Sequence, residues 1–241
     1  HSPVVVGELN YGDLRVVRHK DGKTEVYRVS EELQPIVRKA SEAFLAHKVI
    51  VCEGKTELGF CRGLDQWWSR GGGPSFALAG IALADGGGTE APRVAKALAG
   101  LSYEVSFLGD SDRPLNPNQA TLETAGVKVF IWDDNVSLEE RVVLDLPWNG
   151  VDEIVRLAMD DKGEESVQDA VAARLGVSAS LTGGPSDWLD SGTSKNDLRK
   201  AVGTAAKEKG WFKRVDLAED LSKIVAQHLD SIRETDLARK I

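Results

Sequence analysis

Acidic residues gather at four places in the sequence, and each place directly follows a short apolar run. They are Glu53 with Glu57, then Asp85, then Asp110 with Asp112, and last Asp133 with Asp134, shortly before Glu139 and Glu140. Residues two apart on an extended backbone point to one side, so Asp110 and Asp112 should converge. Converging carboxylates repel one another without a counterion, and hard cations such as Mg²⁺ take oxygen ligands. The pattern predicts a divalent-cation site, and the few scattered histidines argue against zinc.

The apolar runs are spaced like the strands of a parallel sheet. They cover residues 48–52, 76–84, 104–108 and 127–132, and helical patterns at 56–69, 91–101 and 118–125 lie between them. Parallel strands need crossover connections, so this alternation predicts an α/β fold with a parallel sheet flanked by helices. Ligands bind beyond the carboxyl ends of such strands, which is where the acidic residues fall. Gly86 to Gly88 lacks the spacing of a dinucleotide-binding fingerprint.

The segments on either side of this sheet have different patterns. Residues 14–29 alternate around Asp21 and Gly22 and predict a β-hairpin, followed by a helix over 31–47 with Ser30 as its cap. After Trp132 we expect helices at 138–146, 151–159, 166–175, 195–209 and 217–232, interrupted by a loop over 178–194. The fold prediction therefore adds an N-terminal hairpin and a helical subdomain to the sheet.

Composition narrows the classes of protein. The net charge is −8, and the hydrophobic and charged fractions of 41% and 28% are typical of a globular chain. We find no signal peptide and no apolar run long enough to span a membrane, so we predict a cytoplasmic protein that does not bind membranes. Cys52 and Cys61 give neither a disulfide framework nor a zinc spacing. An acidic chain can still bind phosphate once cations fill its carboxylate site, and residues 195–214 are locally basic.

Four short motifs resemble the Toprim fold, and more closely the nuclease region of the overcoming-lysogenization-defect (OLD) family. They are VCEGKTE at 51–57, ADGGG at 84–88, GDSDR at 109–113 and SLEE at 137–140. The resemblance covers roughly residues 48–224. It implies a metal-dependent DNA endonuclease that contacts the phosphate backbone with little sequence readout. Ser2 and Pro3, preceded by His1 and followed by valines, resemble the segment that closes an ABC-type ATPase, and no Walker A motif is present.

The resemblance also implies roles for individual residues. Two divalent ions, Mg²⁺ or Mn²⁺, would lie about 3.5–4 Å apart and support an in-line displacement, with Ca²⁺ as an ion that binds without cleavage. The implied metal ligands are Glu53, Glu57, Asp85, Asp110, Asp112 and Glu139. Glu57 is also counted among the catalytic groups, and Lys213 or Lys195 would stabilise the charge on phosphate. The implied domains are 1–47 after a truncated ATPase, a Toprim core at 48–135 and a helical subdomain at 136–241. The family's ATPase domain would be a partner in the longer protein, and oligomers could form through it.

Several other functions remain open at this stage. An RNA-processing Toprim nuclease and a non-catalytic DNA-binding or assembly module, like the recombination mediators, fit the same fold. A primase would need a zinc module and a topoisomerase a nucleophilic tyrosine on a large gate, and neither is visible. A haloacid-type phosphatase carries its Asp-x-Asp after the first strand, whereas here the motif follows the third.

Overall fold

A computed structural model describes residues 2–20, 22–177, 181–190 and 192–241. Its contacts divide these residues into two compact units. The sheet unit comprises 1–58, 68–109 and 113–131, and the helical unit comprises 59–67, 110–112 and 132–241. The domain boundaries expected from the sequence stay a prediction. No helix in the described ranges is both long and apolar enough to cross a bilayer.

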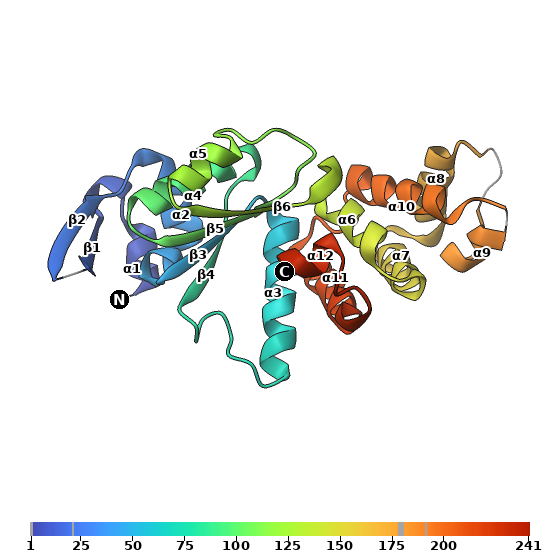
Figure 1. Cartoon of the computed structure of the whole chain (residues 1–241), viewed down its shortest axis with the longest axis horizontal. Helices are drawn as coiled ribbons and strands as arrows, with labels where there is room; N and C mark the ends of the chain where they lie inside the picture. The colour runs from blue at the N-terminus through green and yellow to red at the C-terminus, as the bar shows by residue number, and fades with distance from the viewer. Residues whose placement is uncertain (1, 21, 178–180, 191) are drawn as a thin grey trace. The chain divides into compact units, whose positions relative to one another are not determined.

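The sheet unit contains a four-stranded parallel sheet, which confirms the predicted α/β fold (Figure 1). Its strands are β3 (Lys48–Cys52), β4 (Ile81–Asp85), β5 (Glu104–Gly109) and β6 (Val127–Ile131), in the order β4-β3-β5-β6. The crossover helices are α3 (Lys55–Arg70), α4 (Ala91–Gly100) and α5 (Gln119–Thr124). Val49, Val51 and Phe107 on one face of the sheet are 0% exposed, and Cys52 and Leu108 on the other face are 0% and 6% exposed. This burial on both faces explains the continuous apolar runs in the sequence.

The strand predicted over 76–84 begins too early. Residues before Ile81 form hydrogen-bonded turns, in which the amides of Ala79 and Ile81 donate to the carbonyls of Ser75 and Phe76. Gly80 has a φ of +68°, which lies outside the extended region. The apolar residues of this segment misled the prediction because composition alone does not separate a buried strand from an apolar turn.

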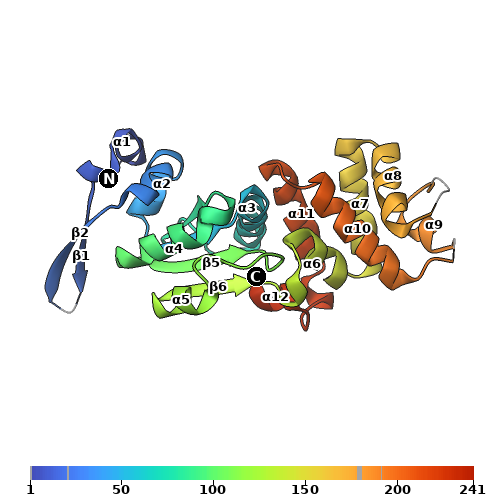
Figure 2. The ribbon, with the colours of Figure 1, turned by 90° about the horizontal axis from the view of Figure 1, so that it is seen from above.

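The predicted hairpin is present and belongs to the sheet unit. Strands β1 (Arg15–Lys20) and β2 (Lys23–Arg28) pair antiparallel, and Gly22 has a φ of +75° in the connecting turn. Asp21 of the predicted turn lies outside the described residues, as does His1 of the predicted ATPase segment. Before the hairpin come α1 (Pro3–Glu8) and the 3₁₀ turn η1 (Tyr11–Asp13). Figures 1 and 2 both show the hairpin extending away from the sheet.

The single helix predicted over 31–47 is wrong, because the chain breaks it into three short pieces. These are η2 (Glu31–Leu33), α2 (Gln34–Lys39) and η3 (Ser41–Leu45). The break lies at Ala40, whose φ of −143° and ψ of 49° are not helical. Ser30 precedes the first piece, but its hydroxyl donates to Glu32 instead of capping the backbone. Leu33, Ile36 and Ala43 are nevertheless buried. The apolar spacing therefore predicted which residues are buried but not that the helix is broken.

The helical unit contains the five predicted helices in their order, together with further short elements that the sequence did not predict. Its elements are α6 (Leu138–Asp145), α7 (Trp148–Lys162), α8 (Glu164–Leu175), α9 (Pro185–Asp190), α10 (Lys195–Lys209), α11 (Val215–Gln227), η6 (Leu229–Ser231) and α12 (Asp236–Lys240). The helix expected to reach residue 232 ends at Gln227. The short helix α9 occupies part of the predicted loop 178–194, of which residues 178–180 and 191 lie outside the described ranges. Buried Trp188 and a hydrogen bond from the Gly184 amide to Asp187 stabilise α9.

Candidate functional site

The carboxyl edge of the sheet carries two of the predicted metal ligands, Glu53 and Asp85. Asp85 is the last residue of β4 and its neighbour across the sheet is Cys52, the last residue of β3. Glu53 comes next in the chain, and its amide donates to Leu108 of β5 at 2.8 Å. Its carbonyl accepts a hydrogen bond from the Gly88 amide at 2.7 Å. Backbone pairing on both sides therefore holds Glu53 at the same edge as Asp85.

Gly109 makes room for the Glu53 carboxylate. A Cβ built on Gly109 would lie 2.7 Å from Glu53 Oε2 and 2.6 Å from the Phe107 ring. Real Cβ atoms do not approach other atoms so closely, so a side chain at this position would displace the carboxylate or the ring. The last residue of β5 is thus part of what positions Glu53.

Glu57 and Asp85 are oriented by backbone amides. Glu57 lies in the first turn of α3 with only 4% of its surface exposed, and its Oε2 accepts from the Gly54 amide at 2.8 Å. The positive end of the helix dipole favours an anion there. Asp85 Oδ1 accepts from the Gly87 amide at 3.0 Å, and Gly87 has a φ of +80°. These bonds direct the carboxylates without cancelling their charge.

In the helical unit, Asp110 is bound to the start of α6. Its Oδ1 accepts from the Leu138 amide at 2.8 Å. Next to it, the Ser111 amide donates to the Val136 carbonyl, and the Val136 amide donates to the Ser111 hydroxyl at 2.9 Å. The segment 110–112 is therefore fixed to the turn that precedes α6, with Asp110 at a helix terminus that favours negative charge.

Asp112 has a cationic partner that sequence reasoning missed. Lys207 Nζ on α10 lies 3.0 Å from Asp112 and 3.0 Å from Glu140. Burial would lower the pKa of Lys207, but its hydrogen bonds to the two carboxylates outweigh burial and raise it. Lys207 therefore remains an ammonium ion. In the sequence it was one of several lysines in a basic segment, and no local signal distinguished it.

Glu139 is a buried carboxylate close to a predicted catalytic lysine. It is 4% exposed, and burial raises its pKa, partly offset by hydrogen bonds from its own backbone and Ser137 and by the charge of Lys213. Glu140 instead forms a capping box with Ser137 at the start of α6. Lys195 Nζ lies 5.4 Å from the centre of the Trp148 ring. Of the two predicted lysines, Lys213 is thus the one that acts electrostatically on a predicted ligand.

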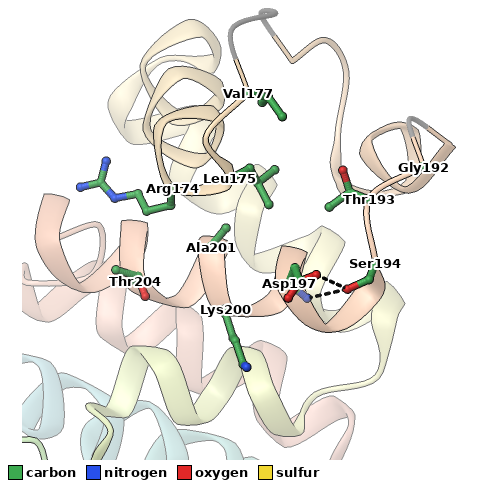
Figure 3. Close-up of a pocket in the computed structure, with 10 residues that line it drawn as sticks. All are labelled: Arg174, Leu175, Val177, Gly192, Thr193, Ser194, Asp197, Lys200, Ala201 and Thr204. Carbon is green, nitrogen blue, oxygen red and sulfur yellow. Dashed lines mark hydrogen bonds between the residues drawn. The ribbon is translucent and has the colours of Figure 1, made fainter.

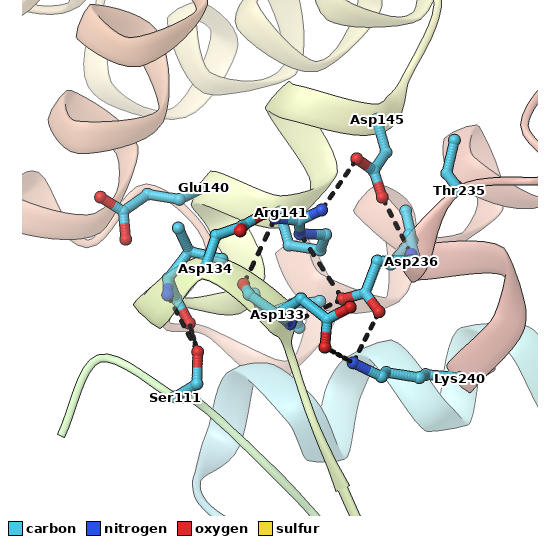
Figure 4. Close-up of polar contacts among 12 residues, drawn as sticks. Ser111, Asp133, Asp134, Glu140, Arg141, Asp145, Thr235, Asp236 and Lys240 are labelled. Carbon is cyan, nitrogen blue, oxygen red and sulfur yellow. Dashed lines mark hydrogen bonds and ion pairs between the residues drawn. The ribbon is translucent and has the colours of Figure 1, made fainter. Parts of the chain in front are cut away.

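Asp133 and Asp134, which follow β6, belong to a network around Arg141 (Figure 4). Arg141 pairs with Asp134 at 3.0 Å, with Asp145 at 3.2 Å and with Asp236 at 3.8 Å. A further lysine takes part: Lys240 of α12 lies 2.8 Å from Asp133 and 2.6 Å from Asp236. Oppositely charged groups thus already accompany these carboxylates, and the network attaches α12 to α6.

A hollow in the helical unit is lined by none of the predicted metal ligands. It has a volume of about 600 Å³ between α8 and α10, and Leu175, Val177 and Ala201 contribute to its wall. Arg174 and Lys200 border it, but Figure 3 shows both side chains extending away from the open space. The Arg174 guanidinium instead binds Glu208 on α10. The hollow therefore does not offer a cation to an anionic ligand.

The donor chemistry of the sheet edge fits a hard divalent cation. Glu53, Glu57 and Asp85 provide carboxylate oxygens, the ligands that Mg²⁺ prefers, and Gly109 leaves space beside one of them. Among the residues that the structure describes, however, no three His, Cys, Asp or Glu side chains form a ready metal-binding group. Each unit thus contains predicted ligands that are held in place, and the site assignment stays a prediction.

A comparison with protein-family models matches part of the chain. Residues 44–112 match the family model described as overcoming lysogenization defect protein-like, TOPRIM domain. The matched segment runs from the end of η3 through β3, β4 and β5 to Asp112, and so includes five of the six predicted metal ligands. No curated protein matches the chain.

Proposed function

We propose, on the premise that the chain contains an OLD-like Toprim region, that it is a divalent-metal-dependent nuclease that cleaves phosphodiester bonds of DNA. The observation that carries the proposal is the sheet edge, where Glu53 directly follows β3, Asp85 ends the neighbouring β4 and Gly109 leaves space for a carboxylate. Concentrated negative charge at the carboxyl ends of parallel strands favours a bound cation.

We assign metal binding to Glu53, Glu57 and Asp85 in the sheet unit. Asp110, Asp112 and Glu139 are assigned the same role from the helical unit, and two ions are expected. A bound divalent cation would stabilise negative charge on the phosphate oxygens and favour ionisation of an attacking water. The assignment of both ligand groups rests on the resemblance and on the donor chemistry of each unit.

The chain's own groups have separate tasks in this proposal. The amide of Gly54 fixes the orientation of the Glu57 carboxylate, and the amide of Gly87 fixes that of Asp85. The Lys207 ammonium lies 3.0 Å from Asp112 and partly balances its negative charge. Lys213 is proposed to contact the phosphate and stabilise its developing charge, and Lys195 is a second candidate.

The test is cleavage of supercoiled plasmid by the purified chain with Mg²⁺, Mn²⁺ or Ca²⁺. We expect nicked or linear product with Mg²⁺ or Mn²⁺, none with chelator, and none from Glu53→Gln or Asp110→Asn. Glu123→Gln on α5 is the matched control, because it removes one exposed carboxylate that precedes the amino end of β6, and this variant should cleave normally.

Three results would contradict parts of the proposal. Undiminished cleavage by Glu53→Gln and Asp110→Asn would refute the site. DNA binding without cleavage in every metal would favour a non-catalytic assembly module. Cleavage of structured RNA but not of plasmid would favour an RNA-processing nuclease.

A further inference from the structure

The β1–β2 hairpin is a basic ribbon in an acidic chain. Residues 15–28 contain five lysines and arginines against two acidic residues, whereas the whole chain has a net charge of −8. The hairpin extends away from the sheet in both views (Figures 1 and 2). A concentration of positive charge on a projecting element is the usual electrostatic feature of a nucleic-acid contact.

The register of the two strands places like charges opposite each other. Arg15 is the cross-strand partner of Arg28, and on the same face Val17 is the partner of Val26. Both arginines are exposed, and the valines are 60% and 62% exposed. Like charges directly opposite one another destabilise a hairpin. In the described part of the chain neither arginine forms an ion pair; Arg15 donates only to the carbonyls of Gly12 and Leu14.

The opposite face of the ribbon fixes it to the core of the sheet unit. Val16 is 8% exposed and Tyr27 packs against the same core cluster. The Arg18 guanidinium lies 4.0 Å from the centre of the Tyr103 ring. The base of the hairpin is thus held by packing on one face, while the arginine face is left to solvent. A fixed ribbon has little conformational entropy to lose on binding.

We propose that the exposed face of this ribbon binds the phosphate backbone of duplex DNA. Arg15 and Arg28 would contact phosphates, and Val17 and Val26 would pack against the sugars between them. A two-stranded ribbon is narrow enough to enter the major groove. The partner is a polyanion because the face carries paired guanidinium groups without a carboxylate.

The ribbon contacts the sheet at the amino end of β5, whereas Glu53 and Asp85 lie at the carboxyl ends of the strands. Arg18 contacts Tyr103, which immediately precedes β5, whereas Gly109 ends β5 beside Glu53. Six residues of strand span about 20 Å, since each adds about 3.3 Å. This distance corresponds to about six base pairs at about 3.4 Å each. For a duplex that lies along β5, the ribbon would hold it about half a helical turn from Glu53, an inference that rests on the proposed nuclease function.

The test measures binding of a fluorescein-labelled DNA duplex by anisotropy in EDTA, across a series of salt concentrations. Chelator removes any contribution from metal ions, so binding through the ribbon is measured separately from the carboxylate site. Arg15→Gln/Arg28→Gln should weaken binding on the order of tenfold. It should also reduce the slope of log K against log salt by about 1.8, because each lost phosphate contact contributes about 0.9.

The matched control is Arg156→Gln/Arg233→Gln in the helical unit. Those two side chains are 71% and 72% exposed, and their replacement changes the net charge by the same amount. Affinity and salt slope close to those of the unaltered chain are expected from this control. Equal effects of the two double variants would overturn the ribbon proposal, because they would reflect net charge alone.

Two further results separate this proposal from others. The face would be a protein-docking surface if Val17→Thr/Val26→Thr bound a protein partner more weakly while Arg15→Gln/Arg28→Gln kept its DNA affinity. That result would overturn the proposal. The unaltered chain failing to bind duplex DNA would overturn it as well. If Glu53→Gln abolishes plasmid cleavage but Arg15→Gln/Arg28→Gln binds DNA normally, the ribbon proposal alone is refuted. Arginine-dependent binding without cleavage in any metal would support the ribbon and refute the nuclease.

Discussion

Replacing Arg141 by methionine should destabilise the helical unit, because the guanidinium is the counterion of two buried carboxylates. The side chain of Arg141 is 6% exposed, and those of Asp145 and Asp236 are 10% and 4% exposed. Methionine keeps much of the aliphatic length but removes the charge. Asp145 and Asp236 would then remain in a largely water-free environment with less compensation for their negative charge.

The size of the effect follows from the contacts that survive. Removal of one partner from a buried ion pair typically costs about 3–5 kcal/mol. Asp236 retains Lys240 at 2.6 Å and the amide of Asp133, and Asp145 retains the amide of Leu237 at 2.9 Å. These remaining contacts place the expected loss at the lower end, about 3 kcal/mol. For a unit of this size the melting temperature should fall by roughly 10 °C.

Urea denaturation followed by tryptophan fluorescence measures this loss. Trp132 is 2% exposed and directly precedes Asp133, so it reports on the network. Asp134→Asn is the matched control: Asp134 pairs with the same guanidinium but is 76% exposed, and its loss should cost about 0–1 kcal/mol. If Arg141→Met and Asp134→Asn lower the free energy of unfolding equally, the buried ion pairs are not what stabilises the helical unit.

Three other perturbations test local features of the fold. Gly63→Ala should lower the free energy of unfolding in urea by about 1–3 kcal/mol, because the added methyl would lie 1.9 Å from a hydroxyl on α11. Gly100→Ala is its control: it adds a methyl at an open helix end and should be neutral or stabilising. Gly109→Ala should reduce plasmid cleavage and raise the Mg²⁺ concentration required, because its methyl would displace the Glu53 carboxylate. Burial raises the pKa of Tyr103 above its ordinary value of 10.0, so its contribution to stability is present below pH 10 and is lost as the pH rises through the folded pKa. Tyr103→Phe should therefore flatten the fall in unfolding free energy above pH 10.

The strand ends were predictable because two independent signals coincide there. Apolar runs give β3 and β5 nearly to the residue, and the acidic residues that follow them mark the carboxyl edge. The helix over 195–209 was also predicted with its observed bounds, since Ser194 caps its start and Gly210 ends it with a φ of +59°. Such signals are local, and local chemistry is what a sequence displays directly.

Features that depend on distant partners could not be predicted. Lys207 meets Asp112 across 95 positions of sequence, and Asp236 meets the amide of Asp133 across 103. Nothing near any of these residues indicates its partner. The break at Ala40 could not be predicted for a related reason. The apolar residues of 31–47 can be buried in the core whether or not the helix is continuous. Packing decided the conformation there.

The acidic residues at the strand ends look equivalent in the sequence, but they differ in whether a cationic side chain pairs with them. Among the described residues Asp85 makes no ion pair, and its hydrogen bond comes from the Gly87 amide, which orients a carboxylate without neutralising it. Asp112 instead lies 3.0 Å from an ammonium that is itself held by Glu140. A divalent cation at Asp112 would have to share the carboxylate with Lys207, and the two positive charges would repel each other. In the proposed site, Asp85 would therefore be the better ligand of the two.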